Sequence, residues 1–217
     1  AKEFNNLSFP KDFTSDNKQL SGSLIDSLIS LNKDKINIYT NDFAPAVEGY
    51  RWQASGLLKK LVKNEDYNPD SLVTLNRDKF DNFKFLNSDY DEQYANFFAV
   101  NIRQTYYLFM VQLVDELIAS AKYNEAIEFS KKASLLLPED RDSYVRLGKT
   151  YALLKKCDEA RDAYLKVLSL TKRDWQTASS LGVLYKECYQ DELQSKNYFE
   201  ISNKLRLESS GQSLEKF

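Results

Sequence analysis

Hydrophobic positions in residues 107–208 recur at helical spacing, and the pattern as a whole returns every 34 residues. The repeated positions are Leu147, Gly148, Tyr151 and Tyr164, which return as Leu181, Gly182, Tyr185 and Tyr198. Residues three, four and seven apart share one face of a helix, so each set forms one buried stripe. Because a fixed period of this length is typical of stacked helix pairs, the sequence predicts repeats at 107–140, 141–174 and 175–208.

The middle repeat carries the most complete set of anchors. They are Tyr144, Leu147, Gly148, Tyr151, Ala160 and Tyr164. This spacing resembles the tetratricopeptide (TPR) repeat, and the resemblance implies an array of antiparallel helix pairs. The third repeat has Gln194 where a small residue is expected, so we interpret it as a degenerate terminal repeat. Residues 198–208 are expected to cover the end of the array as a capping helix, and residues 209–217 to form a flexible tail.

The first half of the chain has a mixed pattern. It predicts a helix over 23–31, a short strand over 36–40 and a helix over 71–81 that is capped by Asp70. Residues 56–62 fit a strand or a short helix, and we favour the strand. A long helix is expected to open at Asp89 or Asp91 and to run into the first repeat. The predicted fold class is therefore mainly α, with a small α+β region over 1–88 and TPR-like helices over 89–208.

A second resemblance rests on short segments of this first half. They are Ile38-Tyr39, Gly56-Leu57, Leu61-Val62, Asn76, Phe83-Lys84-Phe85 and Asp91-Glu92. Their order resembles the extracytoplasmic part of bacterial multi-pass membrane proteins similar to protein O-mannosyltransferases. Ile36-Asn37 and Lys63 depart from that pattern, which has Arg-Pro and Pro there. The resemblance implies a location on the periplasmic or extracytoplasmic face of a membrane, and a cytoplasmic location is the alternative. The family's catalytic carboxylates would lie in the membrane portion, so none is assigned here.

Composition narrows the possible chemistry. The 30 basic and 32 acidic residues nearly balance, which disfavours a nucleic-acid partner. The absence of histidine excludes Ser/His/Asp and Cys/His sites and histidine-bound zinc. No phosphate-binding glycine motif is present, so we expect neither a cofactor nor an enzyme in this chain. Residues 106–114, the longest apolar stretch, are too short to cross a bilayer. The start at Ala1 instead of Met suggests a processed protein or a piece of a longer one.

Three features have both a functional and a structural interpretation. Asp89-Tyr90-Asp91 has the form of a metal-binding carboxylate pair, or it caps a helix. An aromatic cluster could stack on sugar rings or pack in the core, and its members are Phe97, Phe98, Tyr106, Tyr107 and Phe109. Trp52, which stands among turn-forming residues, is interpreted as a loop anchor or as an exposed contact. Cys157 and Cys188 are expected to be packed thiols, with a single disulfide as the alternative.

A helical array of this kind exposes a concave surface formed by the first helix of each pair. The candidate partner-binding residues on it are Asp115, Asp142, Val145, Lys149, Gln176, Ser179 and Lys186. Val111, Asp115 and Val145 replace the Lys and Asn residues of TPR domains that clamp a terminal carboxylate, so such a clamp is not supported. We expect a non-catalytic module that binds a protein or peptide. The alternatives are a carbohydrate-binding or glycosyl-transfer accessory domain and a free-standing cytosolic TPR adaptor.

Overall fold

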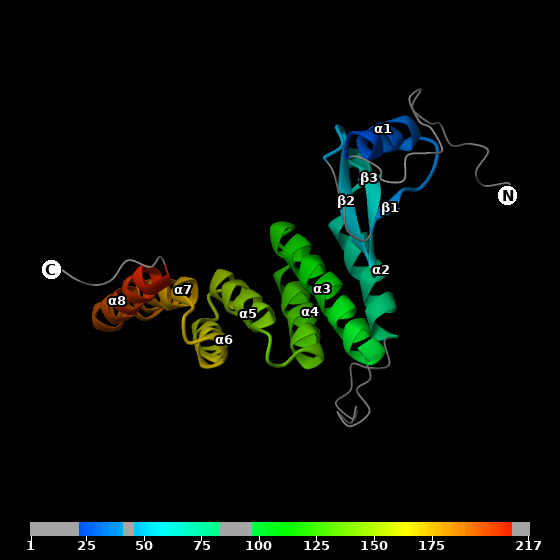
Figure 1. Ribbon diagram of the computed structural model, residues 1–217. Helices are drawn as coiled ribbons and strands as arrows, with labels where there is room; N and C mark the ends of the chain where they lie inside the picture. Colours follow the sequence, from blue (N-terminus) through cyan, green and yellow to red (C-terminus); the bar gives the residue numbers. More distant parts are fainter. Residues whose placement is uncertain (1–21, 41–45, 83–96, 210–217) are drawn as a thin grey trace. The chain divides into compact units, whose positions relative to one another are not determined.

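A computed structural model of the protein describes residues 22–40, 46–82 and 97–209 (Figure 1). The chain divides into two compact units, residues 1–82 and residues 83–217. The predicted boundary between 88 and 89, the predicted helix start at Asp89 or Asp91, and the tail beyond Ser209 lie outside the described residues. In the described residues, the first unit contains a small sheet and two helices, and the second unit contains helices.

The N-terminal unit contains a three-stranded antiparallel sheet in the order β1-β3-β2. Its strands are β1 (Tyr39–Thr40), β2 (Tyr50–Ser55) and β3 (Leu58–Lys63). The preference for a strand over residues 56–62 is confirmed, whereas only the end of the predicted strand 36–40 is β-structure. Strand β2 differs from the sequence interpretation, which places Trp52 in a loop. Gly56, at a φ of +66°, forms the turn between β2 and β3, a conformation that residues with a side chain rarely adopt.

Two helices accompany the sheet, α1 (Gly22–Asn32) and α2 (Pro69–Asp81). The N-cap of α2 is Asn68, whose side chain accepts a hydrogen bond from the Asp70 backbone N–H at 2.9 Å. The predicted cap at Asp70 is therefore wrong by two residues. Pro69 takes the first helical position, where its missing N–H costs nothing and its fixed φ suits a helix.

Asn76 on α2 fastens that helix to the β2–β3 hairpin. Its side-chain oxygen accepts a hydrogen bond from the Gly56 N–H at 2.7 Å, and its amide donates to the Ala54 carbonyl at 3.0 Å. The amide also donates to the Leu72 carbonyl at 2.8 Å. The side chain is fully buried, so each of these bonds satisfies a group that water cannot reach.

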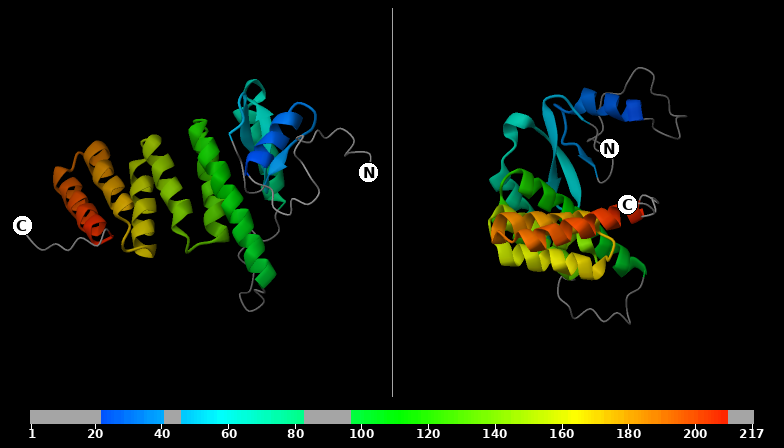
Figure 2. Two further views of the ribbon diagram at one scale, coloured as in Figure 1. Left: turned by 45° about the horizontal axis from the view of Figure 1, so that its top comes forward. Right: turned by 90° about the vertical axis from the view of Figure 1, so that its left-hand side faces the viewer.

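The C-terminal unit contains three helix pairs over residues 97–209. The first pair is α3 (Phe97–Ala119) with α4 (Tyr123–Leu136), and the second is α5 (Arg141–Leu153) with α6 (Cys157–Leu170). The third pair is α7 (Trp175–Leu184), extended by a π-helix (Tyr185–Tyr189), with α8 (Glu192–Ser209). Successive helices run antiparallel and stack in chain order (Figure 2). The predicted fold class, a mainly helical TPR-like array that follows a small α+β region, is confirmed. The residues predicted to cap the array belong to α8 itself.

The small residues of the repeat allow close helix contact. A Cβ atom at Gly148 would lie 2.5 Å from the ring of Tyr164, so α5 and α6 touch at a place where no side chain fits on α5. Leu113, Leu147 and Leu181 are buried at 34-residue intervals along the array. Of the predicted stripe on α5, Leu147 and Gly148 are therefore buried in the array, whereas Tyr144 and Tyr151 are half-buried and pack against its core.

The third pair contains one extra residue. In the turn between the two helices of each pair, one residue has a left-handed backbone conformation: Ala121, Lys155 and Gln190. The first two are 34 residues apart, whereas Lys155 and Gln190 are 35 residues apart. The π-helix before Gln190 absorbs the insertion, as such bulges do. After the π-helix, each residue of the third pair is therefore equivalent to the residue 35 positions earlier in the second pair, and not 34.

The shift corrects two sequence equivalences. The aromatic ring that faces Gly182 belongs to Phe199 and not to Tyr198, and it lies 3.0 Å from the position that a Cβ atom would take at Gly182. The small buried residue of α8 is Ser195, which is only 2% exposed, so Gln194 is not a defect in the repeat. Tyr198 instead stacks on Tyr185, with ring centroids 5.3 Å apart.

Neighbouring pairs are joined through the aspartates that cap the first helices. Asp140 and Asp174 each accept a backbone N–H bond at 2.9 Å, from Asp142 and Thr177 respectively. The Tyr107 hydroxyl donates to Asp140, and burial together with this bond raises the pKa of Tyr107. One repeat later, the Arg141 guanidinium lies 3.0 Å from Asp174. Each cap thus orders its own helix and contacts the preceding pair.

Cys157 and Cys188 form a disulfide, so the expectation of packed thiols is wrong. Cys157 opens α6, and Cys188 lies in the π-helix after α7. Their Cα atoms are 6.0 Å apart although 31 residues separate them. The bond therefore ties the second pair to the irregular segment that absorbs the insertion.

Candidate functional site

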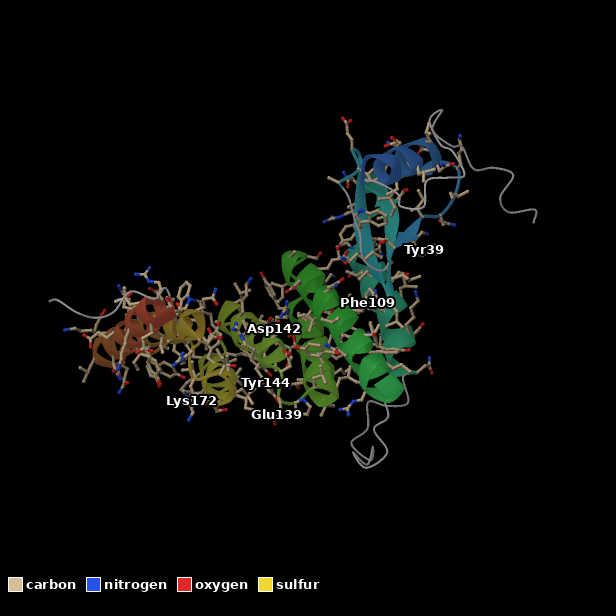
Figure 3. The ribbon with its side chains drawn as sticks, viewed as in Figure 1. Tyr39, Phe109, Glu139, Asp142, Tyr144 and Lys172 are labelled. Atoms are coloured by element: carbon tan, nitrogen blue, oxygen red, sulfur yellow. A yellow bond between two sulfur atoms is a disulfide. The ribbon has the colours of Figure 1, made fainter. Side chains whose placement is uncertain are left out.

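The seven candidate partner-binding residues lie on α3, α5, α7 and the π-helix, a set of surfaces that we call the first-helix face. Asp142 lies in the first turn of α5, and Tyr144 follows on the same helix (Figure 3). The side chains of Asp115, Asp142, Lys149, Gln176 and Lys186 are exposed, whereas Val145 and Ser179 are half-buried. Whether these residues bind a partner stays a prediction.

One part of this face is occupied by an internal ion-pair cluster. Arg146 donates to both carboxylate oxygens of Asp115, at 2.8 and 2.6 Å. The same guanidinium donates to the Asp142 backbone carbonyl at 3.1 Å. Two of the predicted binding residues are thus held by Arg146, which links α3 to α5. The Asp115 carboxylate is therefore less available to a ligand than an isolated aspartate would be.

A pocket with a volume of about 330 Å³ opens between α5 and α7. Lys149 is the one candidate residue that lines it. The other lining residues are Ala152, Leu153, Lys155, Tyr164, Ser180, Val183, Leu184, Glu187 and Cys188. Leu153 and Val183 are 48% and 50% exposed, so two large apolar side chains face solvent at this place. Sequence reasoning missed both, although each lies at an outward position next to the repeated stripe.

The chemistry of the pocket rim is mixed. Lys149 and Lys155 have no ion-pair partner within the part of the chain that the structure describes. The floor contains Tyr164 and Ser180, and the Ser180 hydroxyl donates to the Gln176 carbonyl at 3.1 Å. Burial raises the pKa of Tyr164, so the phenol stays neutral and serves as a hydrogen-bonding group. A ligand with an apolar side chain next to an acidic group would match the exposed apolar side chains and the two lysines of this pocket.

The other sequence features fall at different places. Tyr107 of the aromatic cluster is buried in the array core, and Tyr106 and Phe109 are half-buried. The side chains of Phe97 and Phe98, and the whole of Asp89-Tyr90-Asp91, lie outside the described residues. Trp52 is half-buried on β2 and pairs with Leu61 across the sheet, so it belongs to a strand and not to a loop.

Within residues 22–40, 46–82 and 97–209, no three His, Cys, Asp or Glu side chains come close enough together to hold a metal ion. Over the same residues, no helix combines the length and hydropathy that crossing a bilayer requires.

Comparisons with known proteins give a likeness in fold. No protein-family model matches the sequence, and no curated protein matches it. A solved structure described as "Crystal structure of MamA" aligns with a TM-score of 0.47 at 18% identity, over 66% of this chain and 81% of that chain. A second, "Crystal structure of MamA protein", aligns with a TM-score of 0.46 at 18% identity, over 69% of this chain and 79% of that chain. No residue role follows from similarity at this level.

Proposed function

We propose that residues 97–209 form a non-catalytic protein-interaction module that binds a peptide segment on its first-helix face. The carrying observation is the pocket between α5 and α7, where exposed Leu153 and Val183 stand beside two lysines without ion-pair partners in the described chain. Grooves of helical arrays receive extended or helical segments through apolar anchors. The repeat packing supports the proposal because it leaves these side chains outside the core.

The proposal is tested by selecting binding sequences from a phage-displayed peptide library on the full chain. Each selected sequence is then measured against two variants, Val183→Glu in the pocket and Leu193→Glu on α8. Leu193 is 77% exposed and does not line the pocket, so it is a matched control for adding a charge at an apolar surface position.

The proposal expects that Val183→Glu weakens binding about tenfold or more while Leu193→Glu leaves it unchanged, because burying a new carboxylate in an apolar contact is costly. Selected peptides that bind both variants as tightly as the unchanged chain would refute the assignment of this face. Failure to select any peptide above background would refute the module as a peptide binder.

We further propose that the chain works on the extracytoplasmic side of a membrane. The disulfide between Cys157 and Cys188 supports this location, because such bonds persist in oxidising compartments and are rare in the cytosol. Trapping free thiols with a maleimide reagent in intact cells tests it. The proposal expects no labelled thiol until a reductant is added, and labelling of both cysteines without reductant would support the cytosolic adaptor instead.

The parent protein is proposed to be a membrane protein that resembles the protein O-mannosyltransferases. The segments that carry this resemblance have structural roles here: the Ile38 carbonyl accepts from the Leu61 N–H at 2.9 Å, and Asn76 binds Gly56. Because these residues hold the sheet and α2 together, related proteins could keep them for their fold even if their activities differ. Reading the coding sequence upstream of Ala1 tests the proposal, which requires several hydrophobic spans there. An upstream sequence without such spans would contradict it.

A further inference from the structure

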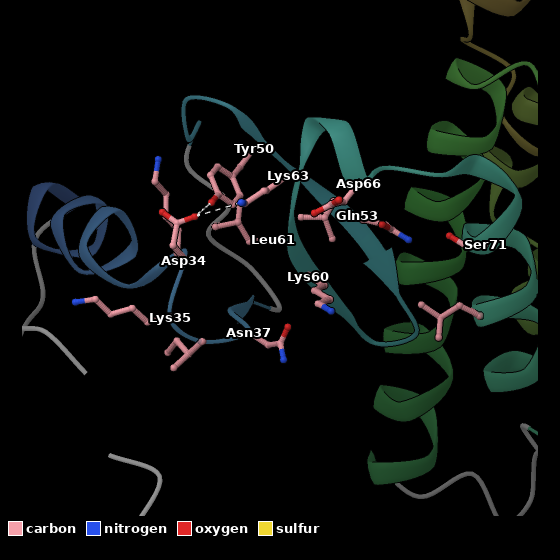
Figure 4. Close-up of a pocket in the computed structure, with 14 residues that line it drawn as sticks. Asp34, Lys35, Asn37, Tyr50, Gln53, Lys60, Leu61, Lys63, Asp66 and Ser71 are labelled. Atoms are coloured by element: carbon pink, nitrogen blue, oxygen red, sulfur yellow. Dashed lines mark hydrogen bonds and ion pairs between the residues drawn. The ribbon is translucent and has the colours of Figure 1, made fainter. Parts of the chain in front are cut away.

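The N-terminal unit contains a second pocket, with a volume of about 630 Å³ and a mostly polar lining (Figure 4). Its walls are the segment 33–37 that follows α1, the strands β2 and β3, and the first half of α2. The charged residues around it are Lys33, Lys35, Lys60, Lys63, Asp34 and Asp66. All of these walls belong to one unit, so the pocket is a property of that unit by itself.

The side chain that singles out this pocket is Gln53 on β2. The residue is only 7% exposed, yet it lines the pocket. Its side-chain amide has no hydrogen-bond partner within the described parts of the chain. The amide faces the open pocket, so solvent can reach it when no ligand is bound, and a polar ligand can take the place of that solvent.

The register of the sheet places a cation beside this amide. Gln53 pairs with Lys60 across β2 and β3, and Lys60 pairs with Tyr39 across β3 and β1. Directly paired residues share one face of a sheet, so the amide, the ammonium group and the phenol ring form one row. The Lys60 ammonium lies 6.0 Å from the Tyr39 ring centroid, and no carboxylate of the described residues pairs with it.

The remaining charges near one end of the pocket already satisfy one another. The Tyr50 hydroxyl donates to Asp34, and the Lys63 ammonium lies 3.8 Å from the same carboxylate (Figure 4). The Lys33 ammonium lies 4.7 Å from the Tyr50 ring centroid. Lys60 and Gln53 are thus a cation and an amide of the lining with unused binding capacity, while the carboxylates of Asp34 and Asp66 disfavour a ligand with many negative charges.

We propose that this pocket binds a small hydroxylated molecule that carries one anionic group, such as a sugar acid or a sugar phosphate. Lys60 pairs with the anionic group, because an ammonium without a carboxylate partner gains most from one. The Gln53 amide, which both donates and accepts, binds a hydroxyl of the ligand. The site is separate from the first-helix face and does not depend on the proposed peptide binding.

The test is a calorimetric titration of the full chain with glucuronate, glucose 6-phosphate and glucose. The anionic sugars are expected to bind at about millimolar Kd, and glucose at least about tenfold more weakly, because it lacks the group that pairs with Lys60. Whichever of the two anions binds more tightly identifies the anionic group that the pocket prefers.

Three variants locate the site. Lys60→Gln is expected to weaken binding of the preferred anion about tenfold, and Gln53→Met to weaken it by a similar factor. Lys59→Gln is the matched control, because Lys59 is the neighbouring residue on β3, points to the other face of the sheet and does not line the pocket. Thermal unfolding of each variant shows whether the unit is still folded. If Gln53→Met does not fold, Lys60→Gln alone tests the site.

The proposal is overturned if neither anion shows saturable binding up to about 10 mM, far above the expected Kd. It is also overturned if glucose binds as tightly as the anions, or if Lys59→Gln weakens binding as much as Lys60→Gln does. Loss of binding in Lys60→Gln with retention in Lys59→Gln supports it.

Discussion

The contact between Gly148 and the Tyr164 ring gives the sharpest test of the helix pairing. A methyl group at position 148 would lie 2.5 Å from two ring atoms and 2.9 Å from a third. In an exposed helix, replacing Gly by Ala stabilises by about 1 kcal/mol. Here the added carbon overpacks a buried ring, which costs about 3 kcal/mol at the upper end of the usual range. Gly148→Ala should therefore lower the free energy of unfolding by about 2 kcal/mol.

A double-mutant cycle isolates the contact from other effects of the two substitutions. Tyr164→Leu removes the ring, so adding Gly148→Ala in that background should no longer be destabilising and should regain up to about 1 kcal/mol. The coupling free energy between the two positions is then about 3 kcal/mol, which is at the top of the range for residues in contact. Urea unfolding followed by far-ultraviolet circular dichroism measures all four proteins.

The equivalent pair in the third repeat supplies a graded control. A Cβ at Gly182 would lie 3.0 Å from the Phe199 ring, so a small movement relieves it, and Gly182→Ala should cost less than Gly148→Ala. The reasoning is refuted if Gly148→Ala is as stable as the unchanged protein, or if it is equally destabilising with and without the Tyr164 ring.

Three further predictions concern other parts of the chain. Cys157→Ala opens a crosslink that spans 31 residues and should lower stability by about 3 kcal/mol, measured by urea unfolding without reductant. Asn76→Ala leaves buried backbone groups without partners and should cost about 2 kcal/mol, whereas exposed Asn82→Ala should cost less than about 0.5 kcal/mol, both measured by thermal unfolding. The bond to Asp34 raises the pKa of Tyr50 to about 12, so Asp34→Asn should return that pKa toward 10.0, as measured by tyrosinate absorbance.

Each of these has a clear contrary outcome. Equal stability of the oxidised protein and the Cys157→Ala variant would show that the crosslink does not constrain the fold. Similar costs for the two asparagine substitutions would remove the special role of Asn76. The pKa of Tyr50 in the folded protein lies above its unfolded value. Its bond to Asp34 therefore stabilises the folded state fully below pH 10.0, and this contribution is lost as the pH rises toward about 12. A Tyr50 pKa unaffected by Asp34→Asn would contradict the assigned cause.

The array is predictable because its determinants are local and repeated. Leu147, Gly148 and Tyr164 each belong to a pattern that recurs at a fixed interval, and helical periodicity needs no knowledge of distant contacts. The one-residue shift is not predictable, because Tyr198 and Phe199 are both aromatic and either could fill the place of Tyr164. Only the π-helix before Gln190 shows which one does.

The N-terminal unit shows where sequence reasoning stops. The alternation of Tyr50, Trp52 and Ala54 along β2 is a usable strand signal, although the neighbouring turn-forming residues favour a loop. Gln53 gives no signal at all, because its burial and its pairing with Lys60 depend on the register of strands that the sequence does not specify. The disulfide is likewise undetermined by sequence, since a separation of 31 residues allows either contact or distance.

The most direct test of the stacked helix pairs is a nuclear Overhauser measurement between the Gly protons and the aromatic rings. The structure predicts cross-peaks from Gly148 to the Tyr164 ring and from Gly182 to the Phe199 ring, with the Tyr198 ring giving its cross-peaks to Tyr185 instead. Cross-peaks from Gly182 to Tyr198 in place of Phe199, or none from Gly148 to Tyr164, would contradict the repeat packing on which the proposed binding face depends.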